Sequence, residues 1–131
     1  MKIFLSVIYM LVLLASSLIP MDRQIWGLQF IIDLKPTIQN LLHVPMYFVL
    51  SVFLLQIFPK SRFGTWKRII LVLLIATLFG IANEVIQTAI PGRYGGVTDI
   101  LLNFVGAAAG IVFFGLIEKS KSGFMRRILC E

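Results

Sequence analysis

Residues 67–93 read KRIILVLLIATLFGIANEVIQTAIPGR, a long apolar run that ends in a Pro-Gly turn. From Ile69 to Gly92 the only charged residue is Glu84. A charged side chain in hydrocarbon costs roughly 2.5–3.5 kcal/mol by the most lenient scale. The stretch therefore predicts a membrane-spanning helix over about 68–90, whose carboxylate has a partner, contacts water or serves a function.

The composition of the whole 131-residue chain supports a membrane protein. Hydrophobic residues make up 59% of it, against about 45–50% in soluble proteins, and the mean hydropathy is +0.95. The net charge of +6 comes from basic residues grouped between apolar stretches, which favours membrane topology over a nucleic-acid partner. One Cys and one His provide no disulfide and no typical metal site. We expect a single integral membrane domain over 1–131 that contacts the lipid bilayer, with no metal and no cofactor.

Three further apolar stretches accompany the 68–90 run. Residues 3–20 carry no charge and are either a cleavable signal peptide or a retained first span. The length of the run favours the retained span. Residues 41–58 and 99–117 form the other two stretches. The sequence thus predicts an all-α membrane protein, a four-transmembrane-helix bundle.

The segments outside these stretches suit the membrane surface. Residues 25–32 are apolar but too short to span, so they are expected to lie at the interface. The tail after residue 118 alternates basic and apolar residues. We expect that tail to rest on an anionic membrane surface.

The distribution of basic residues predicts the orientation. Nine of the twelve Lys and Arg residues lie at the N-terminus, in the 60–68 loop and in the tail. The positive-inside rule then places both termini in the cytoplasm. Glu84, six residues before Ile90, would lie about 9 Å inside the outer end of its helix. Polar residues of three spans would therefore meet on the extracytoplasmic side.

Two local signals concern the ends of the neighbouring spans. Pro45 predicts that the second span either starts near Val44 or is kinked there, with Tyr47 one turn below His43 on the same face. Thr98 is expected to cap the last span. In that span four residues with spacings of four, three and four share one face, and two of them form a GxxxG packing motif: Asp99, Asn103, Gly106 and Gly110.

The polar residues of the spans are the candidate site. Glu84, His43 and Asp99 are candidates for acid/base or proton-binding groups. The structural alternatives are a buried ion pair for Glu84, an interfacial histidine for His43 and an acid at a helix N-terminus for Asp99. Candidate ligand-binding residues are Arg93, whose guanidinium could hold an anion, and the neutral side chains of Gln87, Asn103 and Tyr47, whose alternative is helix packing.

Order, type and spacing of these residues resemble the VanZ-like family of small bacterial membrane proteins. The matching positions, which cover roughly 38–118, are His43-x3-Tyr47, Glu84-x2-Gln87-x3-Pro91-Gly92-Arg93 and Asp99-x3-Asn103-x2-Gly106-x3-Gly110. The family is named for a member associated with low-level resistance to the glycopeptide teicoplanin. The resemblance implies a multi-span protein of the bacterial plasma membrane with a link to the cell envelope or to antibiotic resistance.

Three functions agree with these residues. The first, which we prefer, is an outer-leaflet polar pocket that binds a lipid-linked envelope precursor or a glycopeptide and confers resistance. The second is a membrane-embedded enzyme acting on a lipid or isoprenoid-linked substrate, with Glu84 and His43 as the acid/base pair and Arg93 as electrostatic stabiliser. The third is a structural or regulatory membrane subunit in which the polar cluster only locks the helices together.

Overall fold

The computed structural model describes residues 1–20, 34–93 and 95–119, and all regular structure among them is helical. The helices, in chain order, are α1 (Lys2–Ser17), α3 (Pro36–Leu41), α4 (His43–Ile57), α5 (Lys60–Phe63), α6 (Thr65–Gln87) and α7 (Val97–Lys119). The all-α prediction is confirmed. The expected interfacial segment 25–32 and the tail beyond 119 lie outside the described residues.

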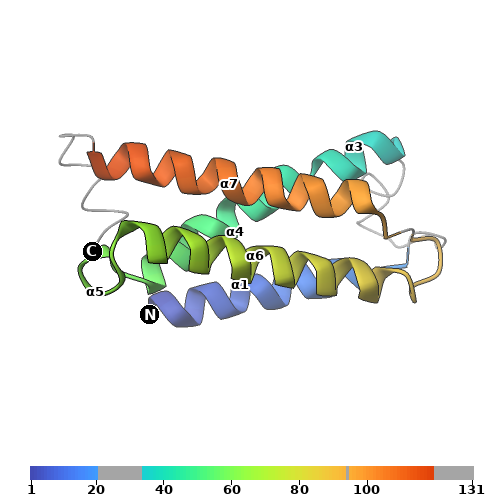
Figure 1. Cartoon of the computed structure of the whole chain (residues 1–131). Coiled ribbons are helices and arrows are strands. Elements are labelled where there is room, and N and C mark those ends of the chain that lie inside the picture. The colour runs from blue at the N-terminus through green and yellow to red at the C-terminus, as the bar shows by residue number, and fades with distance from the viewer. Residues whose placement is uncertain (21–33, 94, 120–131) are drawn as a thin grey trace.

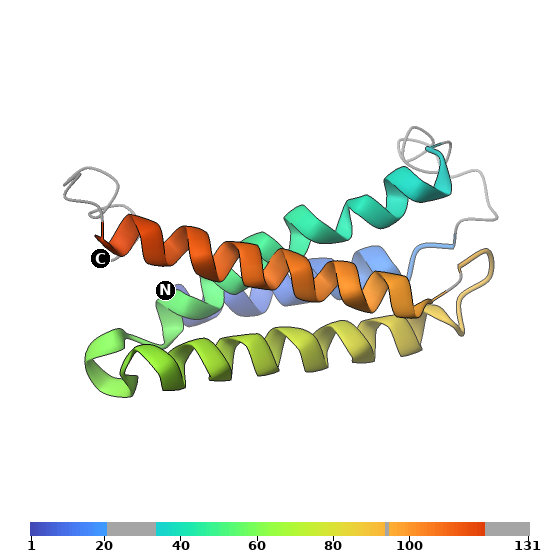
Figure 2. The same cartoon turned by 45° about the horizontal axis from the view of Figure 1, so that its top comes forward.

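The long helices form one bundle with alternating directions (Figures 1 and 2). α1 and α6 run one way, and α4 and α7 run the other way. The most extensive contact is between α4 and α7, followed by those of α6 with α7 and of α1 with α4. We call the end where α1 and α6 finish and α4 and α7 begin the Glu84 end, and the opposite end the Arg68 end.

Three helical stretches, Thr37–Ile57, Thr65–Gln87 and Val97–Lys119, are long and apolar enough to cross a membrane. α1 is apolar as well, but its 16 residues fall short of the roughly 20 that a straight crossing needs. The outward faces are strongly apolar, because side chains such as Ile70, Leu74, Leu101 and Val112 are more than half exposed. Exposed apolar faces around a partly polar interior are expected of a multi-span membrane protein.

Glycines of α7 allow its close approach to α4. A Cβ atom at Gly106 would meet the carbonyl oxygen of Val44, and one at Gly110 would meet Ser51 Oγ and the Phe48 carbonyl oxygen. Small residues at such positions let two helix backbones pack closely in lipid. This contact holds the beginning of α7 beside the beginning of α4.

Two of the three expected helix boundaries differ from the structure. The third agrees with it, because α4 begins at His43, one residue before Val44, after an interruption at Leu42 that separates it from α3. α6 ends at Gln87 rather than at about 90, and Pro91 has no N–H to bond to the Gln87 carbonyl four residues before it. Glu84 therefore lies only about 4.5 Å from the end of its helix. α7 begins at Val97, so Thr98 lies in its first turn instead of capping it.

Candidate functional site

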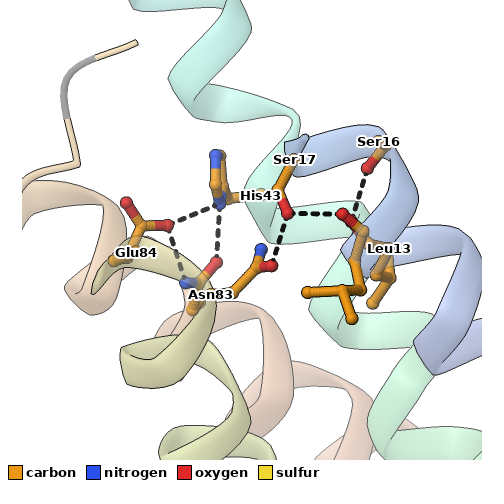
Figure 3. Close-up of polar contacts among 8 residues, drawn as sticks. Leu13, Ser16, Ser17, His43, Asn83 and Glu84 are labelled. Carbon is orange, nitrogen blue, oxygen red and sulfur yellow. Dashed lines mark hydrogen bonds and ion pairs between the residues drawn. The ribbon is translucent and has the colours of Figure 1, made fainter. Parts of the chain in front are cut away.

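A triangle of polar side chains from three helices forms the centre of the site (Figure 3). His43 Nδ1 lies 2.8 Å from Asn103 Oδ1 and 3.5 Å from Glu84 Oε1. Asn103 Nδ2 donates to Glu84 Oε1 over 3.4 Å. The structure thus brings together three of the residues that the sequence singled out.

Helix ends explain why these residues meet. His43 opens α4, Glu84 lies in the last turn of α6, and Asn103 follows the first turn of α7. Because α6 runs opposite to α4 and α7, all three positions fall at the Glu84 end. Asp99 lies one turn before Asn103 on the same buried face of α7.

The hydrogen-bond pattern assigns the protonation of one histidine nitrogen. The amide nitrogen of Asn103 donates to the carboxylate of Glu84, so its amide oxygen is left to face His43 Nδ1. An amide oxygen only accepts hydrogen bonds, and Nδ1 must therefore carry a hydrogen. In a neutral imidazole Nε2 then carries no hydrogen and can accept a hydrogen bond.

Two carboxylates lie deep in this cluster. Glu84 is 3% exposed and Asp99 5% exposed, and they interact electrostatically with each other and with His43. Within the described part of the chain, Glu84 Oε2 and Asp99 Oδ1 are buried without a partner in hydrogen-bond geometry. Unsatisfied buried acceptors are costly and are uncommon in folded proteins. The cluster therefore has unused capacity to accept hydrogen bonds.

The aromatic and amide candidates surround the triangle. The ring of Tyr47 stacks on that of His43, with the centroids 6.5 Å apart and an angle of 12° between the planes. Tyr47 and Gln87 are both buried. Gly80 packs against this layer, since a Cβ there would lie 3.1 Å from Asn103 Nδ2 and 3.3 Å from Tyr47 Cε1.

Arg93 contacts the first helix. Its Nε donates to the carbonyl of Ile19 over 2.9 Å, and its Nη2 donates to the carbonyl of Ser16 over 2.7 Å. Burial lowers the pKa of Arg93, while the Glu84 carboxylate opposes that change, and the guanidinium stays charged. A cation at the C-terminal carbonyls of α1 is electrostatically favourable. The structure shows no Arg93–Asp99 ion pair among the residues it describes.

Two further residues join the cluster to α1, although the sequence did not single them out as site residues. Ser17 Oγ lies 2.7 Å from Asn83 Oδ1 and 2.7 Å from the Leu14 carbonyl oxygen, and both side chains are buried (Figure 3). The sequence feature that could have identified them is a polar residue near the end of an apolar run. Asn83 is next to Glu84, and Ser17 lies in the first span.

The arrangement presents carboxylate oxygens to hydrogen-bond donors and holds an imidazole nitrogen 3.5 Å from one of them. No group of three His, Cys, Asp or Glu residues suited to a metal ion occurs within residues 1–20, 34–93 and 95–119.

The sequence matches the model of a known protein family over most of its length. A family model described as VanZ/LLP1 matches residues 3–118, which extends the matched region to α1, beyond the three spans that carry the motifs. No curated protein and no solved structure matches the chain. Because the match covers most of the sequence and three of the helices can cross a bilayer, this chain is a multi-pass membrane protein that belongs to the VanZ/LLP1 family.

Proposed function

We propose that the cluster of His43, Glu84, Asp99 and Asn103 binds an envelope or lipid-linked ligand, and that this binding contributes to glycopeptide (teicoplanin) resistance. The proposal rests on one observation, the two buried carboxylate oxygens that have no partner in hydrogen-bond geometry among the described residues. A ligand that donates hydrogen bonds to them would remove a penalty of about 1–3 kcal/mol per group. The resemblance to the VanZ-like family supports the link to resistance.

The chemistry of the cluster selects the class of ligand group. Glu84 and Asp99 favour hydroxyl, amide or ammonium groups, which donate hydrogen bonds and carry no negative charge. Arg93 uses two of its five N–H groups on α1, so it retains donors for an anionic group next to them. A ligand with amide or ammonium groups and a nearby phosphate or carboxylate fits both requirements.

His43 is the expected point of access. Its side chain is 13% exposed, whereas that of Glu84 is 3% exposed. A ligand would therefore meet the imidazole first and the carboxylate behind it. From the positive-inside rule we infer that this end faces the extracytoplasmic side of the plasma membrane, where envelope precursors and glycopeptides are found.

A second candidate function, a membrane-embedded enzyme, is favoured by one distance. His43 Nδ1 and Glu84 Oε1 are 3.5 Å apart, slightly beyond the roughly 2.6–3.2 Å at which an acid/base pair transfers a proton. A bound lipid or isoprenoid-linked substrate that draws the two together would complete the pair, with Arg93 stabilising developing negative charge.

The test compares two substitutions of one residue. Glu84→Gln removes the charge and keeps the length, while Glu84→Asp keeps the charge and withdraws it from the cluster. Thr88→Val is the matched control, because Thr88 is an exposed polar residue one turn away whose hydroxyl donates to the Val85 carbonyl of its own helix. The readouts are teicoplanin susceptibility of bacteria producing each variant and thermal unfolding of the purified proteins.

We expect both Glu84 variants to stay folded and to lose resistance, and the Thr88 variant to keep it. Resistance that persists in a folded Glu84→Gln protein would refute the ligand-binding role. If Glu84→Gln and His43→Ala both unfold, the cluster locks the helices and the structural alternative is correct. Turnover of a labelled polyprenyl-linked lipid by the purified protein would favour the enzyme over the binder.

A further inference from the structure

A second polar site lies at the Arg68 end, away from the cluster described above. A cavity of about 160 Å³ opens there, and its charged lining residues are Lys2, Lys60, Arg68 and Glu118. One water molecule occupies about 30 Å³ in the liquid, so the cavity has room for a larger group. Its lining comes from α1, from the α4–α5 region, from α6 and from α7.

Arg68 is the central residue of this cavity. It is only 4% exposed, its Nη1 donates to Glu118 Oε1 over 2.7 Å, and its Nη2 donates to the Leu55 carbonyl over 2.9 Å. The guanidinium also lies 5.0 Å from the centroid of the Phe114 ring. These contacts hold the guanidinium in one orientation at the cavity wall.

The guanidinium is not fully used by the protein. Its Nε is buried and has no hydrogen-bond partner among the described residues, and the two bonds above use two of its five N–H groups. A planar guanidinium with free N–H groups is well suited to phosphate oxygens. Arg68 is thus a buried, oriented donor with unmet hydrogen-bonding capacity.

The charges around the cavity favour an anion. Among the described lining residues Arg68 is paired with Glu118, and Lys60 adds a positive charge to the wall. Glu118 is 26% exposed, so water screens it more than it screens Arg68.

The membrane setting indicates the source of the anion. Both long helices that meet here, α6 at its beginning and α7 at its end, have the length of a bilayer crossing, so this cavity lies near the level of lipid headgroups. Basic pockets between helices at that level bind the phosphate groups of anionic lipids. We propose that the cavity lined by Lys2, Lys60 and Arg68 binds a phosphate anion, supplied by the headgroup of an anionic phospholipid.

The test uses two lysine variants of the full chain. Lys60→Gln removes a charge from the cavity wall without touching the Arg68–Glu118 pair. Lys67→Gln removes the same charge from an exposed residue close in sequence that does not line the cavity. Lipid binding to the detergent-purified proteins is measured by native mass spectrometry with phosphatidylglycerol, with diacylglycerol, which lacks the phosphate, and with inorganic phosphate as competitor.

We expect phosphatidylglycerol to bind the unaltered chain in preference to diacylglycerol. Lys60→Gln should weaken its binding by about fivefold, and Lys67→Gln by less than twofold, because one basic residue near a phosphate contributes about that factor. Competition by millimolar inorganic phosphate would identify free phosphate as the occupant, and no competition would identify the lipid headgroup. Equal weakening by both lysine variants, no effect of Lys60→Gln, or equal binding of both lipids would overturn the proposal.

Discussion

The Nδ1 atom of His43 lies 3.5 Å from the Oε1 atom of Glu84, although one residue opens α4 and the other lies in the last turn of α6. Asn103 of α7 contacts both. The distance therefore depends on how three helices are aligned at one end of the bundle. Packing residues remote from the triangle should control it, and their substitution can be tested.

The first prediction concerns the contact between α4 and α7. Gly110→Ala places a methyl group against the Ser51 hydroxyl and the Phe48 carbonyl. Overpacking of this kind costs about 1–3 kcal/mol, so we expect a lower free energy of unfolding in detergent and loss of the function assigned to the Glu84 cluster.

Gly115→Ala is the matched control for that variant. Gly115 lies in the same helix, and a Cβ there meets nothing within 4 Å. Alanine is a better helix former than glycine by about 1 kcal/mol, so this variant should be as stable as the unaltered chain or slightly more so. Equal destabilisation by both substitutions would show that the α4–α7 contact does not determine stability.

The second prediction separates two adjacent serines of α1. Ser17 reaches Asn83 of α6, whereas the only hydrogen bond shown for Ser16 Oγ goes to the Leu13 carbonyl of its own helix. Hydrogen bonds between membrane helices contribute about 0.6–1.7 kcal/mol. Ser17→Ala should lower the free energy of unfolding by that amount, and Ser16→Ala should leave it nearly unchanged. The reverse order would refute the α1–α6 link.

The third prediction concerns the attachment of α1 by Arg93. Arg93→Gln removes a charged donor that binds the Ile19 and Ser16 carbonyls, and each such bond contributes about 1.5–3 kcal/mol. Hydrogen exchange at the end of α1 should become faster. Arg62→Gln removes the same charge from an exposed residue in contact with the Phe63 ring, and it should leave that exchange unaltered.

The fourth prediction concerns two adjacent glycines in the loop before α7. A Cβ at Gly95 would meet the Glu84 carbonyl oxygen and would lie 3.0 Å from Thr88 Cγ2, whereas the closest atom to a Cβ at Gly96 is Asp99 Oδ2 at 3.6 Å. Gly95→Ala should push the loop away from the end of α6 and reduce resistance. Gly96→Ala should be tolerated. Full resistance in the Gly95 variant would show that close packing of this loop is not required.

Much of the architecture could be predicted because few backbone structures are stable in the hydrocarbon core of a membrane. A backbone in lipid must satisfy its own hydrogen bonds, so each long apolar run becomes a helix, and successive crossings of the membrane alternate in direction. With that alternation His43, Glu84 and Asp99 reach one end of the bundle whatever the details of packing. The sequence by itself therefore determined the fold class, the four apolar helices to within a few residues, and the end of the bundle at which the polar residues lie.

Which polar groups become partners was decided only by the tertiary structure. Arg93 binds carbonyls of α1, Ser17 meets Asn83, and Arg68 pairs with Glu118, and none of these pairs follows from spacing along the chain. The reason is that each depends on the rotation of one helix about its axis relative to its neighbour. That rotation follows from the packing of all the faces together, with glycines such as Gly110 setting how closely two helices approach.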